Sequence, residues 1–141
     1  MAGGRGRGWR AAGVDEVVSL LEPGEVRELA LGEEEALCRG RGLAFTSLPI
    51  PDRGVPESRR QMAALVRRLS QDLMGGRSIA VHCRAGIGRS SLLAAGVMAC
   101  AGLDVSEAFA RIAQARGVPV PDTDGQRAWV LSFAEALPLL V

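Results

Sequence analysis

The sequence is poor in histidine, in cysteine and in long apolar stretches. It has one histidine and three cysteines (Cys38, Cys83 and Cys100) among 141 residues. No run reaches the roughly 18 apolar residues that a membrane span needs, so we expect none. No apolar segment follows the arginines near the N-terminus, so we expect no signal peptide either. An odd number of cysteines without metal-ligand spacing favours free thiols in a cytoplasmic, reducing environment and predicts no metal site.

Strong charge of one sign is also missing. The chain carries 17 basic and 16 acidic residues, a formal net charge of +1, which argues against nucleic-acid binding through bulk electrostatics. The length and a hydrophobic content of 48% predict one domain with a single core. We expect residues 1–13, rich in glycine and arginine, to form a tail and residues 14–141 to form the domain. A basic patch for an acidic partner is the alternative interpretation of the tail.

Strand-like and helical segments alternate along the chain. We expect strands at 15–21, 43–48 and 78–81, the last of them buried. Helices are expected to start near residues 22, 33, 57, 91, 104 and 123, the second as a solvated acidic turn at 33–35. This alternation predicts an α/β domain with a central, mainly parallel sheet flanked by helices. In such sheets, ligands bind beyond the carboxyl ends of the strands.

The most informative segment is VHCRAGIGRSS, residues 81–91. It places Cys83 at the end of a strand and Arg89 at the start of a helix. Backbone N–H groups in a tight loop and the helix N-terminus both favour an anion, and a guanidinium can hold two oxygens of a phosphate. The segment therefore predicts a phosphate site formed by Arg84, Ala85, Gly86, Ile87, Gly88 and Arg89.

The same positive field stabilises a thiolate, which is the reactive form of cysteine. Cys83 is therefore predicted to be a nucleophile beside an oxyanion cradle. The alternative is that Cys83 is an inert buried thiol and that Arg89 only caps the helix.

The pattern His-Cys-x5-Arg-Ser, from His82 to Ser90, resembles the signature of the cysteine-dependent protein tyrosine phosphatase superfamily, in its small dual-specificity-like and bacterial branch. The resemblance extends from about Val14 onward. It implies a dual-specificity-phosphatase-like fold with a shortened N-terminus, since relatives usually begin with further strands and a helix. It also implies a phosphatase that hydrolyses a phosphorylated protein or a small phosphate ester through a cysteinyl-phosphate intermediate, without a cofactor.

Ester cleavage also needs an acid that protonates the leaving oxygen. Asp52 follows a predicted strand, within the proline-rich segment 49–56, and its surroundings resemble the acid loop of this superfamily. We predict that Asp52 is the general acid. In the alternatives, Asp52 only caps a turn, or Asp122 or Asp124 supplies the proton.

Three further residues have supporting roles by resemblance. His82 is expected to order the loop by hydrogen bonds, and Gln126 to orient the water of the second half-reaction. Ser90 is expected to donate a hydrogen bond to the sulfur, or else to cap the helix. Arg84 either favours anionic substrates or is a solvated charge at the rim.

Two other function classes stay open from the sequence. A rhodanese-like sulfurtransferase also places a reactive cysteine in an anion-binding loop, but it needs no external acid. A catalytically inactive module would bind phosphate in the same loop without cleaving an ester. The spacing from Cys83 to Arg89 and the segment around Asp52 favour the phosphatase.

Overall fold

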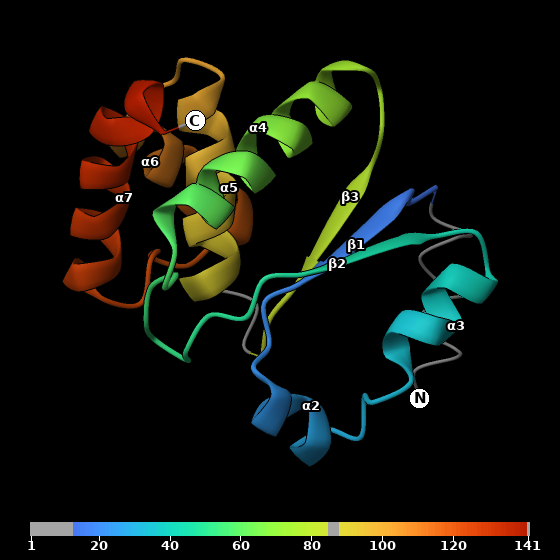
Figure 1. Ribbon diagram of the computed structural model, residues 1–141. Helices are drawn as coiled ribbons and strands as arrows, with labels where there is room; N and C mark the ends of the chain where they lie inside the picture. Colours follow the sequence, from blue (N-terminus) through green and yellow to red (C-terminus); the bar gives the residue numbers. More distant parts are fainter. Residues whose placement is uncertain (1–12, 85–87, 141) are drawn as a thin grey trace.

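The computed structural model describes residues 13–84 and 88–140 (Figure 1). Its centre is a three-stranded sheet in the order β2-β1-β3. Strands β1 (Glu16–Ser19), β2 (Ala44–Ser47) and β3 (Ile79–His82) are all parallel. The register pairs Ser19 with Ser47 on one side and with His82 on the other. All three strands therefore end at the same edge of the sheet, which confirms the predicted parallel α/β arrangement.

Helices surround this sheet. Their bounds are α2 (Pro23–Glu28), α3 (Glu34–Gly40), α4 (Arg59–Met74), α5 (Gly88–Cys100), α6 (Val105–Arg116) and α7 (Asp124–Ala136), followed by the 3-10 turn η1 (Leu137–Leu139). Figure 1 shows α4 to α7 on one side of the sheet, α3 on the other, and α2 beyond the carboxyl ends of the strands. None of the helices in the described part of the chain is both long and apolar enough to cross a membrane.

The main core lies between the sheet and the bundle of α4, α5, α6 and α7. Helix α4 turns an apolar stripe inward because Met62, Leu65, Val66 and Leu69 recur at helical spacing and are buried. A Cβ atom at Gly96 of α5 would lie only 3.1 Å from the Met62 side chain, so this glycine lets the two helices pack closely. The core thereby anchors the start of α5 beneath the carboxyl edge of the sheet.

Helix α5 begins three residues earlier than predicted. Its first residue is Gly88, so Ser90 lies inside the first turn, and the expectation that Ser90 caps the helix is wrong. The capping residue of α7 is Thr123, whose Oγ1 accepts a hydrogen bond from the Gln126 N–H at 3.1 Å. Strand β3 is half-buried along its length rather than buried. The predicted tail lies outside the described residues, apart from Gly13.

A buried ion pair joins the sheet to α4. Glu16 is 1% exposed, and its Oε2 lies 2.6 Å from Nη2 of Arg68 and accepts a hydrogen bond from the Thr46 hydroxyl. The hydrogen bond from Arg68 is the largest influence on the Glu16 carboxyl and lowers its pKa, in spite of the opposing effect of burial. The pattern of α4 predicts a solvated Arg68, whereas the structure places its guanidinium on this carboxylate.

This ion pair predicts an acid-sensitive fold. A carboxyl group whose pKa is lowered by folding contributes stability that is fully present above its unfolded pKa, near the ordinary value of 4.5, and that is lost as the pH falls through the folded pKa. In urea unfolding between pH 7 and about pH 3, Glu16→Gln should lower the midpoint most at neutral pH, and its difference from the wild type should shrink below about pH 4.5. Glu107→Gln, on the exposed face of α6, is the control and should shift little. If the urea midpoints of Glu16→Gln and the wild type differed by the same amount at every pH, this prediction would be contradicted.

Candidate active site

The ends of β2 and β3 lead to the predicted site residues at one edge of the sheet. Cys83 follows β3 directly and is 6% exposed, Asp52 lies in the segment after β2, and Arg89 is in the first turn of α5. Of the predicted phosphate cradle, Ala85, Gly86 and Ile87 lie outside the described residues. The described residues before and after this segment define the rest of the site.

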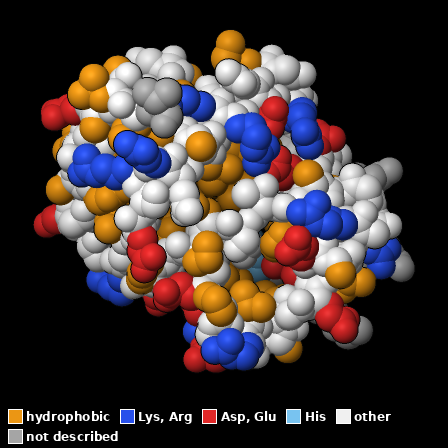
Figure 2. Space-filling model, viewed as in Figure 1, with side chains coloured by type: hydrophobic (Ala, Val, Ile, Leu, Met, Phe, Trp, Pro, Cys, Tyr) orange, Lys and Arg blue, Asp and Glu red, His pale blue; other side chains and the backbone are white. Residues whose placement is uncertain are grey.

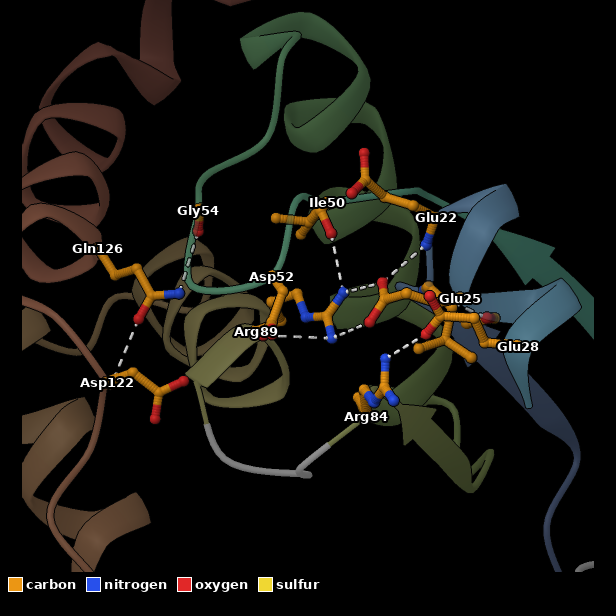
Figure 3. Close-up of polar contacts among 12 residues, drawn as sticks. Glu22, Glu25, Glu28, Ile50, Asp52, Gly54, Arg84, Arg89, Asp122 and Gln126 are labelled. Carbon is orange, nitrogen blue, oxygen red and sulfur yellow. Dashed lines mark hydrogen bonds and ion pairs between the residues drawn. The ribbon is translucent and has the colours of Figure 1, made fainter.

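Arg89 is the best-fixed residue of the site. Although charged, it is only 2% exposed, and its Nη1 and Nη2 donate hydrogen bonds to the two carboxylate oxygens of Glu25 at 2.6 and 2.9 Å (Figure 3). Nη1 also donates to the carbonyl of Ile50 at 2.9 Å. The hydrogen bond to Glu25 outweighs burial and raises the pKa of Arg89, and the nearby Cys83 acts in the same direction. A two-pronged contact of this kind fixes the plane of the guanidinium.

Glu25 contacts the predicted site through Arg89, and the sequence analysis does not single it out. It lies in the first turn of α2, where its Oε1 also accepts a hydrogen bond from the Glu22 N–H at 3.1 Å. The bond from Arg89 is the main cause of its lowered pKa, against the effect of burial. The capping pattern from Glu22 to Glu25 identifies a helix start in the sequence, but nothing in that pattern points to Arg89.

Asp52 lies beside Arg89. Its Oδ1 is 3.6 Å from Nη2 of Arg89, while its own side chain is 61% exposed (Figure 3). A tight turn follows, in which the Gly54 N–H donates to the carbonyl of Pro51 at 2.7 Å. An exposed carboxyl group on a closed turn next to a buried arginine is open to a ligand from solvent.

Gln126 is fully buried, and its amide connects two loops. The Oε1 atom accepts hydrogen bonds from the N–H groups of Asp122 and Thr123 at 3.0 and 3.2 Å, and Nε2 donates to the carbonyl of Gly54 at 3.0 Å. The amide thus holds the segment that carries Asp52 against the start of α7. These contacts place the Gln126 amide between backbone groups, and its predicted water-orienting role stays a prediction.

The carboxylate of Asp122 covers the first residue of α5. A Cβ atom placed on Gly88 would lie 1.9 Å from Oδ2 of Asp122, so a larger residue at position 88 would displace this carboxylate. Glycine at position 88 therefore lets the Asp122 carboxylate pack against the start of α5. Asp124, the other alternative acid, is exposed at the start of α7.

The signature histidine also has an acidic partner. His82 Nδ1 lies 3.1 Å from Oε2 of Glu34, and the two side chains are 13% and 4% exposed. The expectation of a solvated acidic turn at residues 33–35 is therefore wrong for Glu34, which points inward. In Figure 2 the pale blue of histidine is visible in a recess, with red acidic side chains beside it.

Two more predicted residues, Ser90 and Arg84, belong to the same signature segment of the sequence. Ser90 Oγ is buried and finds no hydrogen-bond partner among the described residues, so its predicted bond to the sulfur stays a prediction. Arg84 lies at the rim, where its Nη1 contacts Oε2 of Glu28 at 2.7 Å with both side chains about half exposed or more. The guanidinium of Arg84 is thus ion-paired rather than simply solvated.

A cysteine directly after a strand, a buried arginine in the first turn of the next helix and an aspartate on a neighbouring loop together define a cysteine-dependent phosphatase of the dual-specificity class. Residues 7–102 match the family model Tc-R-P, described as "Polymorphic toxin system, DSP-PTPase phosphatase". The chain belongs to this family.

Solved structures show the same fold. A kinase associated phosphatase is 19% identical over 99% of this chain and 79% of that chain, with a TM-score of 0.87. A mutant form of Tk-PTP is 27% identical over 96% of this chain and 86% of that chain, with a TM-score of 0.79. PTPMT1 in complex with PI(5)P is 21% identical over 89% of this chain and 80% of that chain, with a TM-score of 0.76. No curated protein sequence matches the chain.

Proposed function

We propose that this phosphatase hydrolyses phosphate monoesters with Cys83 as the nucleophile, Arg89 as the phosphate-binding cation and Asp52 as the general acid. One observation carries the proposal. The exposed carboxyl group of Asp52 lies 3.6 Å from the buried guanidinium of Arg89, and both residues lie at the sheet edge where Cys83 follows β3. Nucleophile, oxyanion partner and acid are the three groups that ester cleavage needs.

In the first half-reaction the Cys83 sulfur bonds to phosphorus while the bond from phosphorus to the ester oxygen breaks. The leaving oxygen takes the proton of Asp52. Arg89 is held in place by Glu25 and neutralises charge on the equatorial oxygens without having to reorganise, which is where preorganised donors contribute most. The backbone N–H groups of residues 84–89 complete the proposed cradle.

In the second half-reaction a water molecule attacks the cysteinyl phosphate. The ionised Asp52 accepts a proton from that water, the bond from sulfur to phosphorus breaks, and orthophosphate and the thiolate are released. Gln126 contributes by holding Gly54, two residues beyond Asp52, so that the carboxyl group stays over the site. We propose that Ser90 donates a hydrogen bond to the leaving sulfur.

The proposed substrate is a phosphorylated protein or a small phosphate ester. The solved complex of the structural relative PTPMT1 with PI(5)P supports keeping phosphoinositides among the candidate substrates. Arg84 at the rim supports an anionic substrate, once its partner Glu28 is displaced or shared. We also propose a cytoplasmic location, because Cys38, Cys83 and Cys100 are all free thiols and a catalytic thiolate requires reducing conditions.

Replacing Asp52 by alanine should slow the enzyme in a manner that depends on the leaving group. With phenyl phosphate, whose phenolate leaves poorly without a proton, we expect kcat to fall by about 10²-fold or more. With para-nitrophenyl phosphate, whose phenolate is a good leaving group, the loss should be much smaller. Steady-state kinetics on both esters measure the ratio of the two losses in kcat.

Asp124→Ala is the matched control, since this aspartate is exposed at the start of α7 and should change neither ester's rate. A leaving-group-dependent loss in Asp122→Ala instead of Asp52→Ala would show that the acid is misassigned. An equal rate for Asp52→Ala and the wild type on both esters would contradict the mechanism and would favour a reaction that needs no acid, as in a sulfurtransferase.

A further inference from the structure

The contact between Glu34 and His82 lies next to the nucleophile but outside the proposed chemistry. Glu34 is the first residue of α3, and its Oε2 lies 3.1 Å from Nδ1 of His82. His82 is the last residue of β3 and is followed directly by Cys83. A side chain from a helix on the far side of the sheet therefore reaches the residue that precedes the proposed nucleophile.

Burial restricts how the Glu34 carboxylate and the His82 imidazole can be arranged. The Glu34 side chain is 4% exposed, and a carboxylate that is removed from water is stable only when a donor satisfies it. A hydrogen on Nδ1 of His82 provides such a donor whether the ring is neutral or protonated. The partner of one ring nitrogen decides which nitrogen carries the hydrogen, so Glu34 sets the tautomer and the orientation of the imidazole.

The backbone of His82 is fixed from the opposite direction. Its carbonyl accepts a hydrogen bond from the Leu20 N–H at 2.8 Å, which extends the pairing of β3 with β1 past the end of the strand. The last strand residue is thus held through its backbone by β1 and through its side chain by α3. With both restraints in place, the chain enters the nucleophile loop at a defined angle.

We infer that Glu34 is a positioning residue for the nucleophile and that it acts through His82, an inference that rests on the proposed role of Cys83. Glu34 contacts the imidazole and not the substrate. Its removal should therefore lower the rate at which the sulfur reacts and should leave substrate binding almost unchanged.

The test compares Glu34→Ala, Glu34→Gln and Glu35→Gln in the full chain, with para-nitrophenyl phosphate as substrate. We expect Glu34→Ala to lower kcat by about tenfold or more, which is typical for the loss of a carboxylate that orients a functional imidazole, with KM within about twofold. Glu34→Gln should recover to within about threefold of the wild type, because its amide oxygen still accepts from Nδ1. Glu35 is 56% exposed and pairs with Arg39, so Glu35→Gln should match the wild type.

Two further measurements do not depend on turnover. The chain has one histidine, so the ¹⁵N resonances of its imidazole report His82 alone. The wild type and Glu34→Gln should show a hydrogen on Nδ1, and Glu34→Ala should lose that signature. Alkylation by iodoacetamide, followed by peptide mass, should slow at Cys83 in Glu34→Ala and stay unchanged at Cys100.

The inference is overturned if Glu34→Ala keeps the wild-type kcat and the wild-type alkylation rate of Cys83. It is also overturned if Glu34→Gln is as slow as Glu34→Ala while its imidazole signature is that of the wild type. If the wild type hydrolyses no ester, the proposed function fails, and the imidazole and alkylation data still decide the role of Glu34. Thermal unfolding of each variant identifies losses that come from misfolding, and Glu34→Gln keeps the size of the buried side chain.

Discussion

Replacing Cys83 by serine is expected to abolish turnover, with kcat lowered by roughly 10⁴-fold or more. A serine hydroxyl is a weak nucleophile unless a base removes its proton. The only histidine of the chain is the adjacent His82, and its Nδ1 is occupied by Glu34. A serine hydroxyl is far less acidic than a thiol, so no substitute nucleophile forms. Release of para-nitrophenolate measures the loss.

The same variant should still bind phosphate, because serine is slightly smaller than cysteine and Arg89 keeps its bonds to Glu25. We therefore expect inorganic phosphate to raise the melting temperature of Cys83→Ser and of the wild type alike. Cys100→Ser is the matched control, since Cys100 lies half-buried at the end of α5, and it should keep its activity. Residual turnover above about 1% in Cys83→Ser would exclude Cys83 as the nucleophile.

Replacing Glu25 by alanine should lower both the stability and the activity of the protein. Arg89, which is 2% exposed in the wild type, would keep its contact with the Ile50 carbonyl but would lose both bonds to a carboxylate. Breaking one side of a buried ion pair typically costs about 3–5 kcal/mol. A guanidinium free to shift by about 1 Å should also lower kcat/KM by about 10²-fold. Urea unfolding and steady-state kinetics measure the two losses separately.

Glu25→Gln separates the contribution of the negative charge of Glu25 from the contribution of its side-chain shape. Its amide oxygen still accepts one hydrogen bond from Arg89, so its loss should be intermediate between alanine and wild type. Glu28→Ala is the control on the same helix. Its carboxylate is 62% exposed and pairs with Arg84, and such a surface pair contributes at most about 1 kcal/mol. If Glu25→Ala destabilised the protein no more than Glu28→Ala does, the importance assigned to the buried pair would be wrong.

The sequence predicts the elements well and their ends less well. Strands 15–21 and 43–48 appear as Glu16–Ser19 and Ala44–Ser47, because β-branched and apolar residues mark strands while the flanking residues pair only in part. The start of α5 is placed three residues too late, since the apolar pattern begins at Ser91 whereas the helical backbone begins at Gly88. That difference changes Ser90 from a capping residue into a buried residue of the first turn.

The predicted site residues differ in how well the structure matches their expected surroundings. Cys83, Arg89 and Asp52 meet at one sheet edge, as parallel strands require. The amide of Gln126 was expected to face a water molecule, yet it binds backbone groups of two loops. An exposed glutamine and a loop-connecting glutamine have the same local sequence pattern, so the difference was not visible in the sequence.

The sequence by itself determined the chemistry that depends on neighbours along the chain. A strand, a glycine-rich turn and a helix start bring Cys83 and Arg89 together because only five residues separate them. The tertiary structure alone decided which carboxylates hold this machinery in place. Glu25 reaches Arg89 and Glu34 reaches His82 from helices that follow the first strand. These contacts form only when the parallel register aligns the strand ends. An ion pair depends on distance in space and leaves no periodic pattern in the sequence, so the sequence does not reveal these contacts.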